Sequence, residues 1–348
     1  THDRNIRDVS LLLQWVEHET SFTRHDYGSQ MDSLATRWNR WARLEADGSS
    51  PQYAAWARAI AADDALIDLI DALPAGKKQP NLVFAAARWH GAPSTAQAFA
   101  AWLHQHWAAV RETVLARSTQ TNEAARSAYL TVALARVPGP IALLEVGAAA
   151  GTCLVPDHYR YVFNADGTRS ELVPRHDAGH VTITCELRGI AAPTAMPDIV
   201  WRHGIDLNPV SLDDADEVAW LQTLVWPEHT ERRERLERAL QTVAEARPAI
   251  SRGDLRDDLT ALVADAPNDA TLVVAHSAVF AYLSPDDRMD AAASLRALAD
   301  HVISLEGRDV LAHVRIPAAD ADRAERLFVL AIDGEPLGLA APHGGRLE

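Results

Sequence analysis

An apolar run over residues 141–146 leads directly into the turn Gly147-Ala148-Ala149-Ala150-Gly151. A short apolar segment that ends in this way predicts a strand buried on both faces, as in a parallel sheet. The two glycines permit a tight turn and a close approach of the backbone to a ligand. A helix that began at this turn would direct its free N–H groups at that ligand. The segment therefore predicts an α/β fold with a binding turn after its first buried strand.

The part of the chain before this strand has a helical pattern and no strand-like apolar run. Apolar residues recur at helical spacing from Ile60 to Leu73 and again from Phe99 to Val114. The Val137-Pro138-Gly139-Pro140 segment is the strongest break in the sequence, because proline and glycine both interrupt a helix. We therefore expect an all-helical N-terminal domain over residues 1–138, which caps an α/β domain over residues 139–348.

Short apolar segments alternate with helical segments after residue 139, which is the pattern of a βαβ sheet. Asp166-Gly167 and Asp333-Gly334 are strong signals for tight turns between antiparallel strands. The clearest helix runs from Glu228 to about Arg247, and the terminal Leu347-Glu348 is given no weight in the fold. The expected strands are residues 141–146, 159–163, 169–173, 181–186, 199–205, 249–251, 271–275, 301–305, 327–332 and 337–341.

Composition limits the classes of partner. A formal net charge of −15 argues against a broad nucleic-acid surface. The two cysteines, Cys153 and Cys185, form no C-x-x-C pair, which favours a reducing compartment. No apolar run approaches the ~20 residues that span a bilayer, and no signal peptide is visible. We expect a cytoplasmic protein that acts on a small molecule, without nucleic-acid or membrane partners, and nothing in the sequence indicates an oligomeric state.

No metal site is expected. His104 and His106 are two residues apart on a predicted helix, so their side chains point in different directions. His176, Asp177 and His180 share a glycine-containing loop, but no further ligand completes a tetrahedral set around them.

Acidic residues stand at the predicted ends of two later strands. Asp206, in the segment Gly204-Ile205-Asp206-Leu207-Asn208-Pro209, either accepts both hydroxyls of a ribose or only shapes an Asx turn before Pro209. Asp254 either accepts a hydrogen bond from the exocyclic amine of an adenine or belongs to a helix N-cap near Asp257.

The interval from Glu145 to Asp206 is roughly three times the ~20 residues that a plain βαβ unit needs. We therefore expect an insertion over about residues 157–198 that contains the Asp166-Gly167 hairpin. Glu186 is the alternative ribose ligand if Asp206 ends a different strand. Asp206 is preferred, because its segment matches a ribose-binding strand end better.

Another buried strand runs directly into His276 and Ser277. The carboxyl ends of strands in an open α/β sheet face the ligand crevice, so His276 is better placed for chemistry than the other histidines. A packed, hydrogen-bonded histidine is the alternative. Glu306 follows the next predicted strand, where it either lines the substrate pocket or is a solvated loop carboxylate.

A glycine turn followed by acidic strand ends in this order resembles the core of class I S-adenosylmethionine-dependent methyltransferases. The resemblance implies a Rossmann-like, methyltransferase-type sheet that ends in an antiparallel edge strand. It implies ribose binding by Asp206 and adenine binding by Asp254. The turn carries three alanines where those enzymes commonly have a further glycine. The implied S-adenosylmethionine-binding residues are Glu145, Gly147, Ala149, Gly151, Asp206, Leu207, Asp254, Leu255 and His276.

A narrower resemblance covers nearly the whole chain. It rests on Gln120-Thr121-Asn122-Glu123, Leu144-Glu145-Val146-Gly147, Tyr159-Arg160-Tyr161, Gly204-Ile205-Asp206-Leu207-Asn208-Pro209, Val225-Trp226-Pro227-Glu228 and His276-Ser277-Ala278-Val279. These segments are similar to the motifs of a bacterial domain-of-unknown-function family. Its members pair a helical N-terminal region with a methyltransferase-like core. This resemblance implies a fold and not a reaction.

Three residues are the candidate catalytic bases. Glu123 either reaches over the crevice with Arg117 and Arg126 or lies near the positive end of a helix that begins beside it. Tyr159 either covers the site or packs in the hairpin. His276 is the third, and a base is needed only if the methyl acceptor must lose a proton.

The function expected from these patterns is methyl transfer from S-adenosylmethionine to a small molecule. Most of the rate would come from holding the acceptor in line with the methyl group and excluding water. A non-catalytic nucleoside-binding or regulatory protein is the first alternative. A different enzyme on the same scaffold is the second, because a fold does not fix a reaction.

Overall fold

The computed structural model describes residues 33–174 and 181–348, so the possible ligands His176, Asp177 and His180 lie outside the described residues. The chain divides into two compact units. Of the described residues, the helical unit comprises 33–121 and Asp216–Arg233, and the sheet unit comprises 122–174, 181–215 and Glu234–Glu348.

This division differs from the boundary expected at residue 138. Helix α7 (Ser127–Leu134) belongs to the sheet unit, where all of its residues are buried and it packs on strands β4 and β9. Most of α8 (Ala215–Leu224) and the beginning of α9 (Thr230–Ala246) belong instead to the helical unit. A helical pattern identifies a helix but not the core that it joins, so the proline-rich break does not mark the boundary.

The helices of the helical unit begin at capped residues. Side-chain oxygens of Ser33, Ser50 and Asp63 accept backbone N–H groups in the first turns of α2, α3 and α4. Short π-helical and 3-10 segments join several of the helices. These helices are α2 (Leu34–Trp41), α3 (Pro51–Ala61), α4 (Asp64–Asp71), α5 (Pro80–Trp89) and α6 (Ala96–Ala116).

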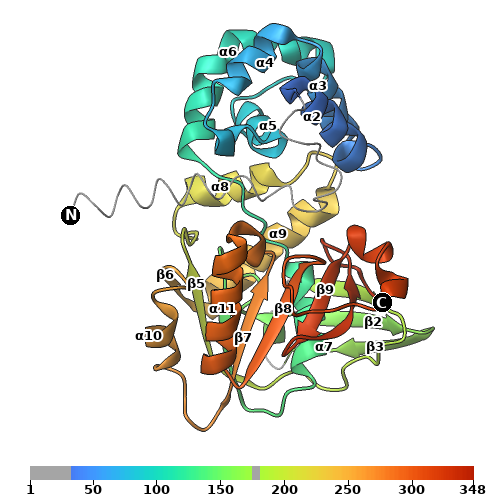
Figure 1. Ribbon diagram of the computed structural model, residues 1–348, viewed down its shortest axis with the longest axis vertical. Coiled ribbons are helices and arrows are strands. Elements are labelled where there is room, and N and C mark those ends of the chain that lie inside the picture. The colour runs from blue at the N-terminus through green and yellow to red at the C-terminus, as the bar shows by residue number, and fades with distance from the viewer. Residues whose placement is uncertain (1–32, 175–180) are drawn as a thin grey trace. The chain divides into compact units, whose positions relative to one another are not determined.

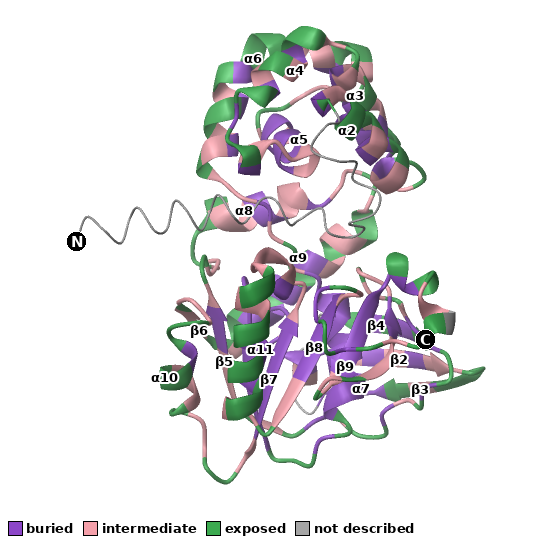
Figure 2. Ribbon diagram, viewed as in Figure 1, coloured by how far each residue is buried: buried purple, intermediate pink, exposed green. Residues whose placement is uncertain are grey.

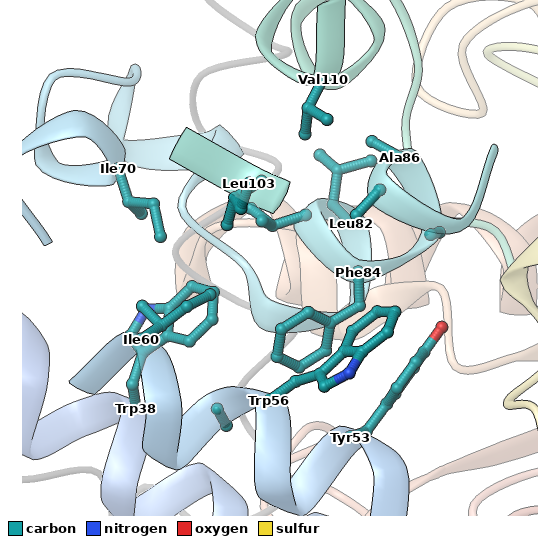
Figure 3. Packing of buried hydrophobic residues seen from close by; sticks show 14 of the residues in the cluster. Trp38, Tyr53, Trp56, Ile60, Ile70, Leu82, Phe84, Ala86, Leu103 and Val110 are labelled. Atoms are coloured by element: carbon teal, nitrogen blue, oxygen red, sulfur yellow. The ribbon is translucent and has the colours of Figure 1, made fainter. Parts of the chain in front are cut away.

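An aromatic cluster forms the core of the helical unit (Figure 3). The rings of Trp56 and Phe99 stack with their centroids 3.8 Å apart. Phe84 contacts Tyr53 at 4.8 Å and Trp38 at 5.5 Å between ring centroids. These buried tryptophans therefore pack the core and do not form a surface on which bases could stack.

The described residues of the sheet unit form a mostly parallel sheet of 11 strands in the order β3-β2-β4-β11-β10-β9-β8-β7-β1-β5-β6. The strands are β1 (Ile141–Val146), β2 (Arg160–Ala165), β3 (Thr168–Leu172), β4 (Thr182–Leu187), β5 (Ile199–Asp206), β6 (Ala249–Arg252), β7 (Thr271–Ser277), β8 (His301–Gly307), β9 (Phe328–Ile332), β10 (Glu335–Ala340) and β11 (Arg346–Leu347).

The strands at the centre of the sheet are parallel and buried. β1 is buried along its whole length and pairs in parallel with β5 on one side and β7 on the other, as its apolar run predicts. β6 and β8 continue this parallel core. Helix α11 (Pro285–Leu298) packs on β8, and Figure 1 shows it in front of the sheet beside β7. Figure 2 shows the buried central strands.

Both predicted hairpins are confirmed. Asp166 and Gly167 join β2 to β3 with φ of 47° and 86°, and Asp333 and Gly334 join β9 to β10 with φ of 53° and 88°. Two successive left-handed residues give the tight turn whose twist matches antiparallel strands. Because β4 pairs with β2 and β11, the inserted segment lengthens the sheet.

The end of the chain departs from the prediction. The β9–β10 hairpin is not an edge of the sheet, because β11 pairs with β10 on one side and with β4 on the other. Leu347 is fully buried between them. A two-residue strand has no periodic pattern, so only its pairing partners identify it.

None of the described helices is long and apolar enough to cross a membrane. Within the same part of the chain, no three His, Cys, Asp or Glu side chains are grouped as metal ligands. His104 Nε2 lies 2.8 Å from Asp63 Oδ2, and His106 Nδ1 lies 2.8 Å from the carbonyl oxygen of Trp102.

Candidate functional site

The direction in which strands are added to the sheet reverses at β1. β5 and β6 lie on one side of β1, and β7 and β8 lie on the other. In open parallel sheets, ligands bind at the carboxyl ends of the strands where the order reverses, because the loops there diverge. The polar residues at the ends of β1, β5, β6, β7 and β8 therefore form the candidate site.

The turn after β1 is built from left-handed residues. φ is 75° at Gly147, 47° at Ala149 and 77° at Gly151. A right-handed helix cannot include such residues. Accordingly, the described stretch from 147 to 159 contains only the 3-10 turn η4 (Pro156–His158) and no α-helix. The helix expected to begin at this turn is therefore a wrong prediction.

Each N–H group of the turn from Gly147 to Gly151 donates within the sheet unit. The acceptors are the Ile205 carbonyl for Gly147 and Ala148, Asp206 Oδ2 for Ala149, Asn122 Oδ1 for Ala150 and the Ala148 carbonyl for Gly151. The expected set of free N–H groups aimed at a ligand is absent from this described turn. Recognition of a ligand here is left to side chains.

Glu145 is a buried carboxylate at the end of β1. It is 6% exposed, and its Oε2 has no hydrogen-bond partner among the described residues. Burial raises the pKa of Glu145 well above its usual value; the charge of Asp206 raises it further, and Arg126 opposes both effects. A ligand ammonium group would satisfy this oxygen and favour the charged carboxylate.

We expect Glu145→Gln to stabilise the ligand-free protein increasingly as the pH rises. With a raised pKa, Glu145 contributes stability that is present below the unfolded-state value of 4.5 and is lost as the pH rises towards the folded-state value. Glutamine does not ionise, so the gain should be about 1–3 kcal/mol at pH 8 and close to zero at pH 4.5. Chemical denaturation at both pH values measures it. A gain that is equal at the two values would contradict the expectation.

Asp206 ends β5, the strand next to β1. Its Oδ2 accepts the Ala149 N–H at 2.9 Å, and its Oδ1 accepts the Asn208 N–H at 2.7 Å, which is the Asx turn considered above. Burial raises the pKa of Asp206, and these two N–H groups oppose the rise. Each oxygen keeps a second lone pair, so the carboxylate can still accept two ligand hydroxyls.

The alternative ribose ligand, Glu186, lies elsewhere in the sheet. Its strand, β4, is separated from β1 by β11, β10, β9, β8 and β7. Glu186 Oε1 accepts a hydrogen bond from Asn164 on the neighbouring strand β2. The strand order therefore leaves Asp206, and not Glu186, beside the glycine turn.

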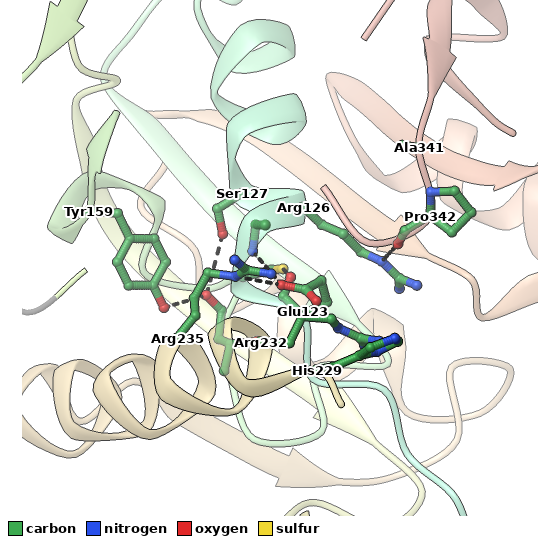
Figure 4. Close-up of polar contacts among 12 residues, drawn as sticks. Glu123, Arg126, Ser127, Tyr159, His229, Arg232, Arg235, Ala341 and Pro342 are labelled. Atoms are coloured by element: carbon green, nitrogen blue, oxygen red, sulfur yellow. Dashed lines mark hydrogen bonds and ion pairs between the residues drawn. The ribbon is translucent and has the colours of Figure 1, made fainter. Parts of the chain in front are cut away.

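The segment before α7 brings a cation and an amide to this turn. Arg126 donates from Nε to the Pro342 carbonyl at 2.9 Å (Figure 4) and from Nη1 to Ser277 Oγ at 3.2 Å. Asn122 holds the turn through Oδ1, whereas its buried Nδ2 has no hydrogen-bond partner within the described residues. The sequence indicated Arg126 only as a neighbour of Glu123, and Asn122 only as part of the Gln120-Thr121-Asn122-Glu123 motif.

Glu123 is 5% exposed and does not reach over a crevice. Its Oε1 accepts the Arg235 Nε–H at 3.0 Å and the Ala125 N–H at 3.1 Å (Figure 4). The second bond makes Glu123 the N-cap of the 3-10 turn that leads into α7, so the structure supports the alternative that places Glu123 beside the start of a helix. The ion pair with Arg235 holds the carboxylate in place.

Tyr159 has no exposed surface. Its hydroxyl donates to the Thr152 carbonyl at 2.7 Å, which Figure 4 shows, and burial raises its pKa well above the usual value. The structure thus supports the packing alternative for Tyr159.

Asp254 follows β6, but the chain itself uses its carboxylate. Oδ1 accepts the backbone N–H and the Nε–H of Arg256, both at 3.0 Å, and Oδ2 accepts from Nη2 at 2.6 Å. Burial alone would raise the pKa of Asp254, but these bonds hold it below its usual value. Contact with an adenine would compete with Arg256. Of the leucines implied by the resemblance, Leu207 is exposed and Leu255 is partly buried.

His276 lies on the opposite face of the sheet from Glu145. In the β1–β7 register, Val146 pairs with His276 and Glu145 pairs with Ala275. Side chains alternate between the two faces along a strand, so His276 follows Val146 and not Glu145. The residues expected to share one site therefore divide between two faces of the sheet.

His276 and Glu306 form a buried pair that the sequence did not reveal. His276 Nδ1 lies 2.7 Å from Glu306 Oε1, which also accepts the N–H groups of Val279 and Phe280 at 3.0 and 3.1 Å. Glu306 is 2% exposed, so a solvated loop carboxylate is a wrong prediction. A spacing of 30 residues on two different strands leaves no local signal for this contact.

Residues 35–348 match a family described as uncharacterised proteins conserved in bacteria, DUF2332. The chain belongs to this family. The match covers all the described residues of the sheet unit and nearly all of those in the helical unit, which confirms the bacterial-family part of the narrower resemblance. No curated protein and no solved structure matches the chain.

In this member of the family, the residues around the glycine turn have complementary chemistry. Glu145 and Asp206 offer acceptors, while Asn122 and Arg126 offer donors. Such a set suits a ligand that carries an ammonium group, a carboxylate and neighbouring hydroxyls.

Proposed function

We propose that the sheet unit binds S-adenosylmethionine at the carboxyl end of β1 and transfers its methyl group to a small molecule. One observation carries the proposal: the buried Glu145 carboxylate, whose Oε2 lacks a partner among the described residues, lies near Asp206 where the strand order reverses. The ammonium group of the methionine moiety would satisfy Glu145. The ribose hydroxyls would bind Asp206.

Two further groups suit the carboxylate of the methionine moiety. Arg126 is 7% exposed and lies close enough to Glu145 to affect its pKa. The Nδ2 of Asn122 is a buried donor with no partner in the described ranges. A guanidinium and an amide N–H beside a carboxylate match a zwitterionic amino acid. Side chains would thus take the role that free N–H groups of the turn cannot fill.

The bound cofactor would supply an electrophilic methyl group, and the chain would supply position. Glu145 and Arg126 would fix the amino-acid end and Asp206 the ribose, with water excluded from the reacting atoms. Glu123 is already bonded to Arg235, and His276 belongs to the other face. The acceptor that fits this site best is therefore one that reacts without a general base.

Isothermal titration calorimetry with S-adenosylmethionine and S-adenosylhomocysteine tests the proposal. We expect micromolar binding by the unmodified protein and about 30-fold weaker binding by Asp206→Ala, or about 2 kcal/mol, because two ligand hydroxyls lose their acceptor. Asp254→Ala is the matched control. It should change the affinity less than about threefold, because Arg256 already occupies that carboxylate.

Failure of the unmodified protein to bind either compound would overturn the proposal. An equal loss in Asp206→Ala and Asp254→Ala would contradict the assignment of ribose to Asp206 alone. If binding is found, incubation with methyl-labelled cofactor and a pool of metabolites separates the enzyme from a binding protein. Transfer of label to a small molecule is the expected result.

A non-catalytic binding protein is the second candidate. The observation that favours it is the engagement of the predicted bases by the protein itself: Glu123 with Arg235, Tyr159 with Thr152 and His276 with Glu306. In that case calorimetry gives the same dependence on Asp206, and no labelled product forms.

A further inference from the structure

Arg126 is a buried cation without an anionic partner among the described residues. Its side chain bonds to a carbonyl and a hydroxyl, and its Cζ lies 5.2 Å from the centroid of the Phe328 ring. Glu145 is near enough to be affected by the charge of Arg126, but the two side chains make no ion pair. A buried charge is normally paired, so the environment of Arg126 indicates an anionic ligand.

Ser277 lies on the same face of the sheet as Glu145. In the β1–β7 register Glu145 pairs with Ala275, and side chains two residues apart on a strand share a face. The backbone of Ser277 is fixed as well, because it pairs with Leu305 of β8 and the N–H that follows it donates to the Leu305 carbonyl at 3.0 Å. The polar side chain that the end of β7 contributes to the face of the glycine turn is therefore Ser277 and not His276.

Two hydrogen bonds set the orientation of the Arg126 guanidinium. Nε donates to the Pro342 carbonyl at 2.9 Å, and Nη1 donates to Ser277 Oγ at 3.2 Å. Nη2 makes no hydrogen bond to any described residue. Rotation about the Cζ–Nε bond would exchange Nη1 with Nη2, and the bond to Ser277 opposes that rotation. Ser277 thus keeps Nη2 in one position, where it can donate to a ligand carboxylate.

We propose that Ser277 is a positioning residue, which orients Arg126 and so makes the site selective for ligands with an α-carboxylate. The proposal rests on S-adenosylmethionine as the ligand, because the methionine moiety supplies that carboxylate. A guanidinium that is already held in one orientation loses less conformational entropy when it binds a carboxylate. The effect of Ser277 should therefore fall on the carboxylate alone, and the contacts proposed for Glu145 and Asp206 should not depend on it.

Decarboxylated S-adenosylmethionine is the probe, because it keeps the sulfonium, the ammonium group and the ribose but lacks the carboxylate. In calorimetry we expect the unmodified protein to bind S-adenosylmethionine about 30-fold more tightly than this compound. Ser277→Ala should weaken the binding of S-adenosylmethionine about fivefold and change the affinity for the decarboxylated compound less than about twofold. A purely structural role of Ser277 would weaken the binding of both compounds equally.

Two further variants separate the hydroxyl of Ser277 from the fold. Ser277→Thr keeps the hydroxyl and should bind S-adenosylmethionine within about twofold of the unmodified protein. Ser304→Ala is the matched control on β8. Because Ser304 pairs with His276, its side chain lies on the opposite face from Ser277. The control should leave the preference for the carboxylate unchanged.

Nuclear magnetic resonance of the guanidinium tests the positioning without any ligand. The Nε and Nη signals of Arg126, assigned with Arg126→Lys, report the rotation about the Cζ–Nε bond. We expect Ser277→Ala to speed this rotation at least about fivefold, because one hydrogen bond to a charged group is lost. Ser277→Thr and Ser304→Ala should leave the rotation unchanged.

An equal loss of affinity for both compounds in Ser277→Ala would overturn the proposal, as would an unchanged rotation of Arg126 in that variant. If neither compound binds the unmodified protein, the proposed function fails. Faster rotation in Ser277→Ala would even then support the positioning of Arg126 by Ser277, and an unchanged rotation would refute it.

Discussion

Glu306→Leu is expected to lower the free energy of unfolding of the sheet unit by about 3–5 kcal/mol. Leucine has a similar volume but no acceptor, so three donors lose their partner: the buried His276 Nδ1 and Phe280 N–H and the part-buried Val279 N–H. Hydrogen exchange measures the loss, because protection of the amides in β7 and the following loop should fall accordingly.

Two matched variants separate this effect from others. Glu306→Gln keeps one acceptor oxygen, so it should cost only about 1–2 kcal/mol. Glu186→Leu removes a strand carboxylate that is exposed, and it should stay within about 0.5 kcal/mol of the unmodified protein. A loss below about 1 kcal/mol in Glu306→Leu would show that the carboxylate does not organise the loop after β7.

The strands could be predicted because their patterns are local. The apolar run at 141–146 coincides with β1, and the segments expected at 199–205 and 271–275 are extended by one or two residues in β5 and β7. The extra residues, such as Asp206 and Ser277, are polar. The apolar pattern stops before them, although their backbones still pair with the neighbouring strands. Both Asp-Gly turns were recognisable because few residues adopt left-handed φ.

The partners of the polar residues could not be predicted in the same way. Asp206 was identified at a strand end, but its bond to the Ala149 N–H depends on β5 lying beside β1. The sequence also indicates Asp254 as a possible acceptor, but Arg256 already donates hydrogen bonds to its carboxylate. The residue type and its position predict that a side chain can accept a hydrogen bond. The fold determines whether the donor is a ligand or another residue of the protein.

Glu145 and His276 lie on opposite faces of the sheet because successive side chains along a strand alternate between the two faces. Both stand at the carboxyl end of a parallel strand, which suggested one site. A shift of a single residue in register exchanges the faces. The register of Val146 with His276 thus gives two chemically different regions, one around the glycine turn and one around the buried pair of His276 and Glu306.

Gly147→Ala is expected to lower the free energy of unfolding of the sheet unit by about 2–5 kcal/mol. A left-handed φ of 75° costs alanine about 1–2 kcal/mol. The added methyl group would also overlap Cγ2 of Val279, in the loop after β7, at a further cost of about 1–3 kcal/mol. Gly147 thus permits the left-handed turn after β1 and also leaves room for Val279 of the loop after β7 to pack against that turn.

Gly167→Ala and a double variant separate the cost of the left-handed backbone from the cost of the overlap with Val279. Hydrogen exchange of the sheet unit measures the loss of stability in each variant. Gly167 has a φ of 86° and open space around its missing side chain, so only the backbone cost of about 1–2 kcal/mol should remain. In Gly147→Ala/Val279→Ala the overlap is removed, so the double variant should be more stable than the sum of the single losses by about 1–3 kcal/mol. Additive losses, with Gly147→Ala no worse than Gly167→Ala, would contradict close packing of Val279 on the turn. The space over Gly147 would then be open to a ligand, as the glycine-rich turn first suggested.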